Sequence, residues 1–152
     1  MVDESDRQRN QVMAYSFYID TAIDCVFIQH FGDYEIGEGI CSVEAFVREP
    51  SYHNNMNILR DFRQTTLPSN FGESPIVIES QKRMKDNDEL LAGACQIALV
   101  VGSAKDYGIM HRYTVSYRLG TLAERRPFRD IAKARNWLEI PDGYEIKIST
   151  SD

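Results

Sequence analysis

The stretch of residues 95–101, CQIALVV, decides the fold class of this 152-residue chain. Six of its seven residues are apolar, and it is bounded by Gly93 and Gly102. A strand that is buried on both faces of a sheet needs no alternation of polar and apolar residues, so this run predicts a central strand. Such strands are typical of parallel sheets that are covered by helices.

The sequence after this strand predicts further helices and strands. Residues 105–119 are predicted to form a helix because apolar side chains recur every four positions, and Gly120 ends it. Residues 127–128 suggest a short strand, and Asp130 is the expected N-cap of a helix that runs through Leu138. A turn at Pro141-Asp142-Gly143 then precedes an alternating stretch, which predicts an extra C-terminal strand of undetermined pairing.

The sequence before the central strand predicts an opening hairpin followed by alternating helices and strands. Residues 14–20 and 24–31 have the pattern of strands, and the three residues between them fit an antiparallel hairpin. Asp33 is the expected N-cap of a helix through Val47, and residues 57–62 predict a short buried strand that ends at Asp61. Residues 75–91 are predicted to be helical, although the aliphatic run 76–78 also fits a strand.

This order of elements predicts a single α/β domain. Its sheet is expected to be mixed but mainly parallel, with about five strands and with helices packed on it, plus the extra C-terminal strand. Residues 1–12 are predicted to be a flexible arm because they hold almost no apolar side chains. The domain is then expected over residues 13–140, with residues 141–152 as a tail.

The composition is typical of a folded globular protein, with 43% hydrophobic and 26% charged residues. Three cysteines are too few and too scattered for a disulfide scaffold, which favours a reducing, cytoplasmic setting. No apolar run approaches the roughly 18 residues that a transmembrane helix needs. The polar N-terminus lacks the apolar centre of a signal peptide.

The net charge of −6 hides an uneven distribution. Residues 105–135 contain eight basic and three acidic residues, so this third of the chain is basic and the remainder is strongly acidic. A basic region of this kind fits either an acidic or phosphate-bearing partner, or ordinary solvated helix faces. The negative total charge argues against nucleic-acid binding.

Several short motifs of the C-terminal half occur in the order of one known family. The first three are a buried strand at Ile97–Val101, an aromatic-Gly pair at Tyr107-Gly108 and a helix that carries Arg112. A strand that ends in Phe128-Arg129 and a closing helix with Trp137-Leu138 follow. Asp61 stands where the family has a strand that ends in Asp. The chain resembles the SpoIIAA-like domains, which are related to the STAS type, over roughly residues 14–138.

Two departures limit what this resemblance implies. The family's Arg usually lies three residues after the Gly, where this chain has His111, and Arg112 follows it. The phosphorylatable serine motif of anti-sigma-factor antagonists is replaced here by Asp61-Phe-Arg-Gln-Thr-Thr66. The resemblance therefore implies the fold without the phosphorylation switch, and fold alone does not determine function.

No catalytic set, metal motif or cofactor motif is apparent, so no catalytic residue, metal or cofactor is expected. The loop after the central strand and the helix that follows it supply the candidate ligand-binding residues Lys105, Tyr107, Gly108, His111 and Arg112. The candidate partner surface is basic and comprises Arg125, Arg126 and Arg129.

These observations favour a non-catalytic regulatory module that acts through an unknown protein partner. The alternative is a domain that binds a small anionic or lipid-like ligand in a pocket beside the helix at 105–119. A homodimer, formed through the C-terminal strand at a sheet edge, is compatible with either function.

Overall fold

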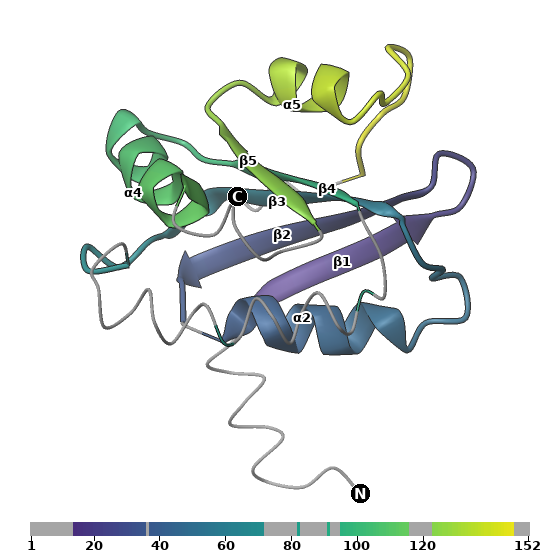
Figure 1. Ribbon diagram of the computed structural model, residues 1–152, viewed down its shortest axis with the longest axis horizontal. Helices are drawn as coiled ribbons and strands as arrows, with labels where there is room; N and C mark the ends of the chain where they lie inside the picture. The colour runs from purple at the N-terminus through teal and green to yellow at the C-terminus, as the bar shows by residue number, and fades with distance from the viewer. Residues whose placement is uncertain are drawn as a thin grey trace, which may run out of the picture.

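The computed structural model describes residues 14–35, 37–71, 82, 91, 95–115 and 123–147. Its centre is a sheet whose strands lie in chain order: β1 (Tyr15–Asp20), β2 (Cys25–Asp33), β3 (Asn57–Thr66), β4 (Gln96–Val100) and β5 (Glu124–Phe128). Strands β1 and β2 are antiparallel, and the other neighbouring pairs are parallel (Figure 1). The predicted mixed, mainly parallel sheet with an opening hairpin is confirmed.

Helices cover both faces of this sheet. Buried residues of α2 (Glu38–Val47) and α4 (Ala104–Val115) share one core with the inward residues of the strands, whereas α5 (Ile131–Trp137) packs on the opposite face. Figure 1 shows α2 and α5 on opposite sides of the strands. Because side chains alternate along a strand, Val26 and Ile28 of β2 lie in the first core and Phe27 lies in the second.

The predicted helix from Asp33 is wrong at its start. Strand β2 continues to Asp33 and pairs with the end of β3, where Asp33 lies opposite Thr66 after a register shift between Gln29 and Phe31. Strand β3 likewise does not end at Asp61. The two extensions supply each other's backbone hydrogen bonds, and α2 begins only after Gly37, whose φ of 114° suits a glycine.

The predicted starts of α4 and α5 agree with the structure to within one residue. The strand predicted at 127–128 is too short, because β5 begins at Glu124, where it already pairs with β4. Ser103 Oγ accepts a hydrogen bond from Asp106 N at the start of α4, and Asp130 Oδ1 accepts one from Ala132 N at the start of α5. The predicted arm at residues 1–12 lies outside the described residues. So does the predicted helix at 75–91, except for Lys82 and Leu91.

The expected C-terminal strand is not formed over residues 144–147, the part of it that the structure describes. Tyr144 instead stacks on Phe27 of β2 with ring centroids 5.7 Å apart, and its hydroxyl donates to Asp20 Oδ2 at 2.7 Å. The guanidinium of Arg135 binds the carbonyl oxygens of Pro141, Asp142 and Tyr144. Because Arg135 and the sheet face hold this segment, its alternating pattern does not lead to strand pairing here.

Candidate functional site

The candidate ligand residues of the sequence lie together, but not in a cavity. Lys105, Tyr107, Gly108, His111 and Arg112 are all exposed on the outer face of α4. The rings of Tyr107 and His111 are 6.1 Å apart and stacked at 23°. The inward face of the same helix carries Ile109 and Met110, which are buried in the core. These five residues therefore form part of a surface.

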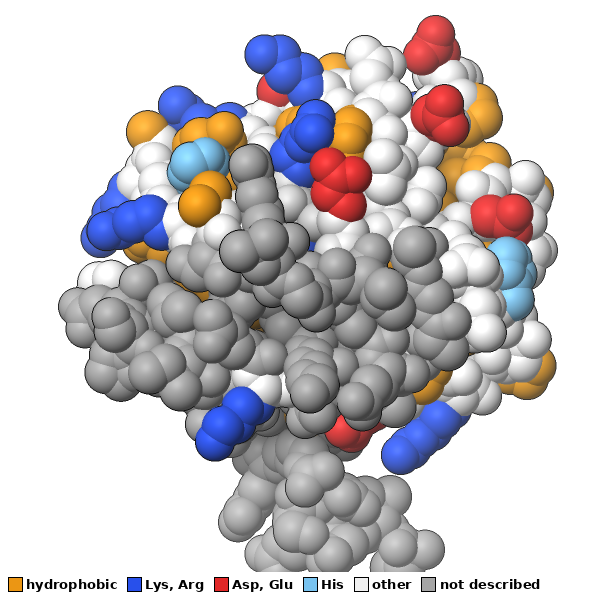
Figure 2. Space-filling model, in the orientation of Figure 1, with side chains coloured by type: hydrophobic (Ala, Val, Ile, Leu, Met, Phe, Trp, Pro, Cys, Tyr) orange, Lys and Arg blue, Asp and Glu red, His pale blue; other side chains and the backbone are white. Residues whose placement is uncertain are grey.

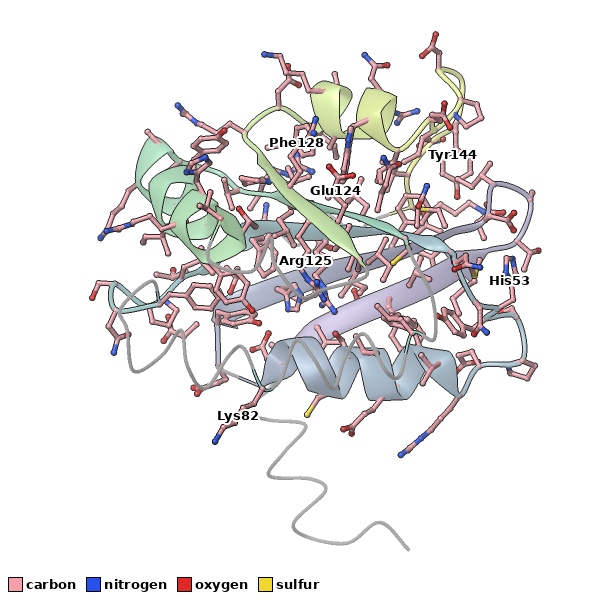
Figure 3. All side chains as sticks on the ribbon, viewed as in Figure 1. His53, Lys82, Glu124, Arg125, Phe128 and Tyr144 are labelled. Atoms are coloured by element: carbon pink, nitrogen blue, oxygen red, sulfur yellow. The ribbon has the colours of Figure 1, made fainter. Side chains whose placement is uncertain are left out.

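The three candidate partner arginines are separated by the geometry of β5. Arg125 lines a cavity on the side of the sheet that α2 and α4 cover, and Figure 3 shows its side chain extending from β5 toward that side. Arg126 points to the other face, where its guanidinium lies 4.9 Å from the ring centroid of Trp137. Arg129 follows the strand and is exposed. Adjacent strand residues point to opposite faces, so these arginines do not form one patch.

The cavity beside Arg125 has a volume of about 50 Å³ and lies between the sheet and the helices α2 and α4. Its wall contains a second guanidinium, that of Arg60 from β3. The remaining lining is mainly aromatic and aliphatic: Tyr34, Gly39, Val43, Phe62, Phe71, Leu91, Ile97, Leu99, Met110 and Tyr113. Among the described lining residues, two basic groups thus face one small space whose other walls are mainly aromatic and aliphatic.

Arg60 is the most unusual residue of this cavity because it is charged and only 7% exposed. Its Nη1 donates to Ser42 Oγ at 2.8 Å and lies 3.3 Å from His30 Nε2, and its Nη2 donates to Gly39 O at 3.2 Å. Among the described residues, no carboxylate lies within 4.0 Å of the guanidinium. Burial lowers the pKa of Arg60, and the charge of Arg125 acts in the same direction.

Behind Arg60 lies a buried pair formed by His30 and Glu38. His30 Nδ1 is 2.8 Å from Glu38 Oε2, and neither side chain is accessible to solvent. Since an arginine can only donate, His30 Nε2 must accept, which places the proton of a neutral ring on Nδ1. Burial and the charge of Arg60 lower the pKa of His30 well below 6.5, and burial raises the pKa of Glu38 to about 7.

Sequence reasoning missed Arg60, His30 and Glu38. Arg60 stands between Ile58 and Phe62 on the inward face of a strand, and His30 continues the inward face of Val26 and Ile28. In the sequence, these two residues could have been found as charged or titratable residues on the apolar face of a strand that alternates with a period of two. The pairing of Glu38 with His30 had no signal, because it depends on the position at which α2 crosses the sheet.

A wider groove of about 570 Å³ lies on the opposite face of the sheet, beside α5. Gln29 lines it, is only 3% exposed, and its Oε1 has no hydrogen-bond partner among the described residues. Nearby Arg63 donates through Nε and Nη2 to the buried carboxylate of Asp61 at 2.9 and 2.8 Å, so its charge is satisfied by that ion pair. The groove consequently has weaker ligand-binding features than the cavity at Arg60.

Metal sites, membrane-spanning helices and reactive cysteines would each indicate a function. Within the described parts of the chain, no three His, Cys, Asp or Glu residues are placed to hold a metal ion, and no helix is long and apolar enough to cross a membrane. The three cysteines form no disulfide, and burial raises the pKa of the Cys25 thiol to about 12. Cys25 is therefore a protonated core residue at neutral pH.

Comparisons with known proteins support the fold. No family model and no curated protein match the sequence. The structure is similar to that of an uncharacterized protein of the DUF3478 family, with a SpoIIAA-like fold, from Shewanella loihica PV-4. The TM-score is 0.51 at 13% identity, and the match covers 83% of this chain and 94% of the other. The chain has a SpoIIAA-like α/β fold, as the resemblance predicted.

Proposed function

We propose that this SpoIIAA-like chain is a non-catalytic regulatory module that binds an acidic surface of a partner protein with the outer face of α4. The main support for this proposal is the position of the exposed hydrophobic side chains. The two large hydrophobic side chains that are exposed among the described residues, Tyr107 at 36% and Val115 at 45%, both lie on this helix. Exposed apolar groups that cluster on one element are typical of interaction sites.

The arrangement of charge on α4 supports an acidic partner. Tyr107, His111 and Val115 are spaced four residues apart and lie along one side of the exposed face. Lys105 and Arg112 are seven residues apart, so they lie along the other border of that face. Figure 2 shows hydrophobic and basic side chains gathered over the region of α4. A protein surface with acidic groups around an apolar centre complements this pattern.

A cytoplasmic location is part of the same proposal. The three cysteines form no disulfide in the structure, which fits a reducing compartment.

The proposal is tested with matched surface variants in affinity purification from native lysate, followed by binding measurements with the purified partner. The double variant Tyr107→Asp and Val115→Asp is expected to weaken binding at least tenfold. Lys133→Asp on the exposed side of α5 serves as the control and is expected to bind normally. Since all three residues are exposed, their circular dichroism spectra and melting temperatures should match those of the wild type.

Three results would overturn the proposal. The first is a partner that binds the double variant as tightly as the wild type. The second is a wild-type affinity that does not fall as salt concentration rises, because an acidic partner requires a screened, charge-dependent contribution. The third is stoichiometric turnover of a metabolite by the purified protein.

A further inference from the structure

We infer that the cavity between the sheet and the helices α2 and α4 binds a small organic carboxylate, whose oxygens accept hydrogen bonds from Arg60. This site is separate from the exposed face of α4. The first reason is the cost of burying a guanidinium. A charged group inside a protein requires a counter-charge or a full set of hydrogen bonds. Arg60 is almost fully buried, and no carboxylate of the described residues contacts it.

The second reason is the number of hydrogen-bond donors on Arg60. A guanidinium group has five N–H donors. Bonds to Ser42, His30 and Gly39 use three of them, and all three acceptors are neutral groups. The donors that remain belong to a side chain that lines the cavity. Two parallel N–H groups of an arginine match the two oxygens of a carboxylate.

The third reason is the electrostatic potential of the cavity. The guanidinium of Arg125 lines the same space, and its positive charge opposes that of Arg60 strongly enough to contribute to a lower pKa of Arg60. The nearest negative group in the network, Glu38, is separated from Arg60 by the ring of His30. An anion beside Arg60 would therefore stabilise a buried guanidinium whose own hydrogen-bond partners are all neutral.

The class of anion follows from the size and the walls of the cavity. A volume of about 50 Å³ is several times the roughly 10–15 Å³ that one water molecule requires, so it admits a carboxylate with a short carbon body. Among the described lining residues, four aromatic rings, those of Tyr34, Phe62, Phe71 and Tyr113, and several aliphatic side chains form most of the wall. Such walls favour an apolar body over a fully hydrated inorganic phosphate.

The test is calorimetric titration of the full chain with sodium acetate and sodium propionate, with sodium chloride at matched ionic strength and inorganic phosphate as comparison ligands. Saturable binding of at least one carboxylate, without equal binding of chloride or phosphate, is expected. Arg125→Met should weaken carboxylate binding at least tenfold. Arg126→Met is the matched control, because the neighbouring arginine points to the other face of the sheet.

A third variant keeps the test valid where loss of Arg60 prevents folding. Gly39 lies in α2 and lines the cavity, and a Cβ built there lies 3.4 Å from Tyr34 Oη. Gly39→Ala should preserve folding because alanine favours a helix, while its methyl group removes part of the cavity and weakens carboxylate binding. Arg60→Met, where it folds, should abolish binding.

Several results would overturn the inference: no saturable carboxylate binding by the wild type, phosphate binding that exceeds carboxylate binding, or equal effects of Arg125→Met and Arg126→Met. The Tyr107→Asp and Val115→Asp variant should retain carboxylate binding. Its behaviour separates a failure of this site from a failure of the protein-interaction proposal.

Discussion

Arg60 Nη1 lies 3.3 Å from Nε2 of His30, and both side chains are buried. Because Arg60 can only donate, His30 accepts a hydrogen bond at Nε2 and donates one to Glu38 from Nδ1. Protonation of the ring would place an N–H against the guanidinium, which carries only donors. This chain of three side chains connects the cavity wall to the start of α2.

His30 is expected to be neutral at pH 6 and above, with its proton on Nδ1. Its pKa is lowered by burial and by the charge of Arg60. His53 is the internal control, because its hydrogen bond to Asp24 raises its pKa and it should titrate above 6.5. Histidine nitrogen chemical shifts followed against pH distinguish the two. A positively charged His30 at pH 6 would contradict the assigned tautomer.

Glu38→Gln should change how stability depends on pH. The pKa of Glu38 is about 7 in the folded chain and near 4.5 when unfolded, so the folded state holds this proton more tightly. The contribution of Glu38 to stability is therefore largest below about pH 4.5 and decreases as the pH rises toward 7.

The measurement is urea unfolding of both proteins at a series of pH values. The free energy of unfolding of the wild type, minus that of Glu38→Gln, should decrease between pH 5 and pH 8. Because the pKa of His30 is lowered on folding, His30 reduces stability as the pH falls below 6.5. Both proteins contain His30, so its effect cancels in the difference. A difference that stays constant over this range would show that Glu38 has an ordinary pKa.

Gln29→Met should stabilise the protein by about 1 kcal/mol, because it removes a buried polar atom that lacks a partner among the described residues. The side chains have similar shapes, so packing beneath the groove should be retained. Urea unfolding gives the change in free energy. Gln64→Met, at an exposed position of the same groove, is the control and should have little effect. Destabilisation by Gln29→Met would mean that Gln29 makes a necessary hydrogen bond.

Tyr144→Phe should lower stability at neutral pH and raise the pKa of Asp20. The tyrosine hydroxyl donates to Asp20 Oδ2 at 2.7 Å, and this bond is the largest cause of the lowered pKa of Asp20. A carboxyl group whose pKa is lowered on folding stabilises the fold at pH values above its ordinary pKa of 3.8. This contribution disappears as the pH falls. The melting temperatures of the two proteins should therefore converge in acid. A gap that persists there would indicate that ring packing on Phe27 is altered instead.

Most of the fold could be predicted because it depends on local patterns. Six apolar residues in CQIALVV indicated a strand buried on both faces, and Asp130 marked the start of α5 correctly. The boundary at Asp33 was misplaced because the extension of β2 depends on its pairing with the end of β3, which no local signal shows. The C-terminal alternation was misread because Arg135 and Phe27 hold that segment.

The candidate site was less predictable than the fold. The basic residues from 105 to 129 were visible as a charge pattern, but the pattern did not show that Arg125 and Arg126 face opposite sides of the sheet. Residues on α4 were grouped correctly in space because they share a helix face. Arg60 was overlooked because its surroundings in the sequence read as an ordinary strand.

The sequence by itself determined the α/β class, the order of strands and helices, and the exposed face of α4, because these depend on the periodicity of neighbouring residues. Only the tertiary structure decided that Arg60 and Arg125 line one cavity and that His30 and Glu38 lie behind Arg60. They come from β3, β5, β2 and α2, and parallel pairing places Arg60 beside Leu99 and Arg125 beside Ile97 on the same face of β4. Such proximity follows from strand register and helix position, which no single stretch of sequence contains.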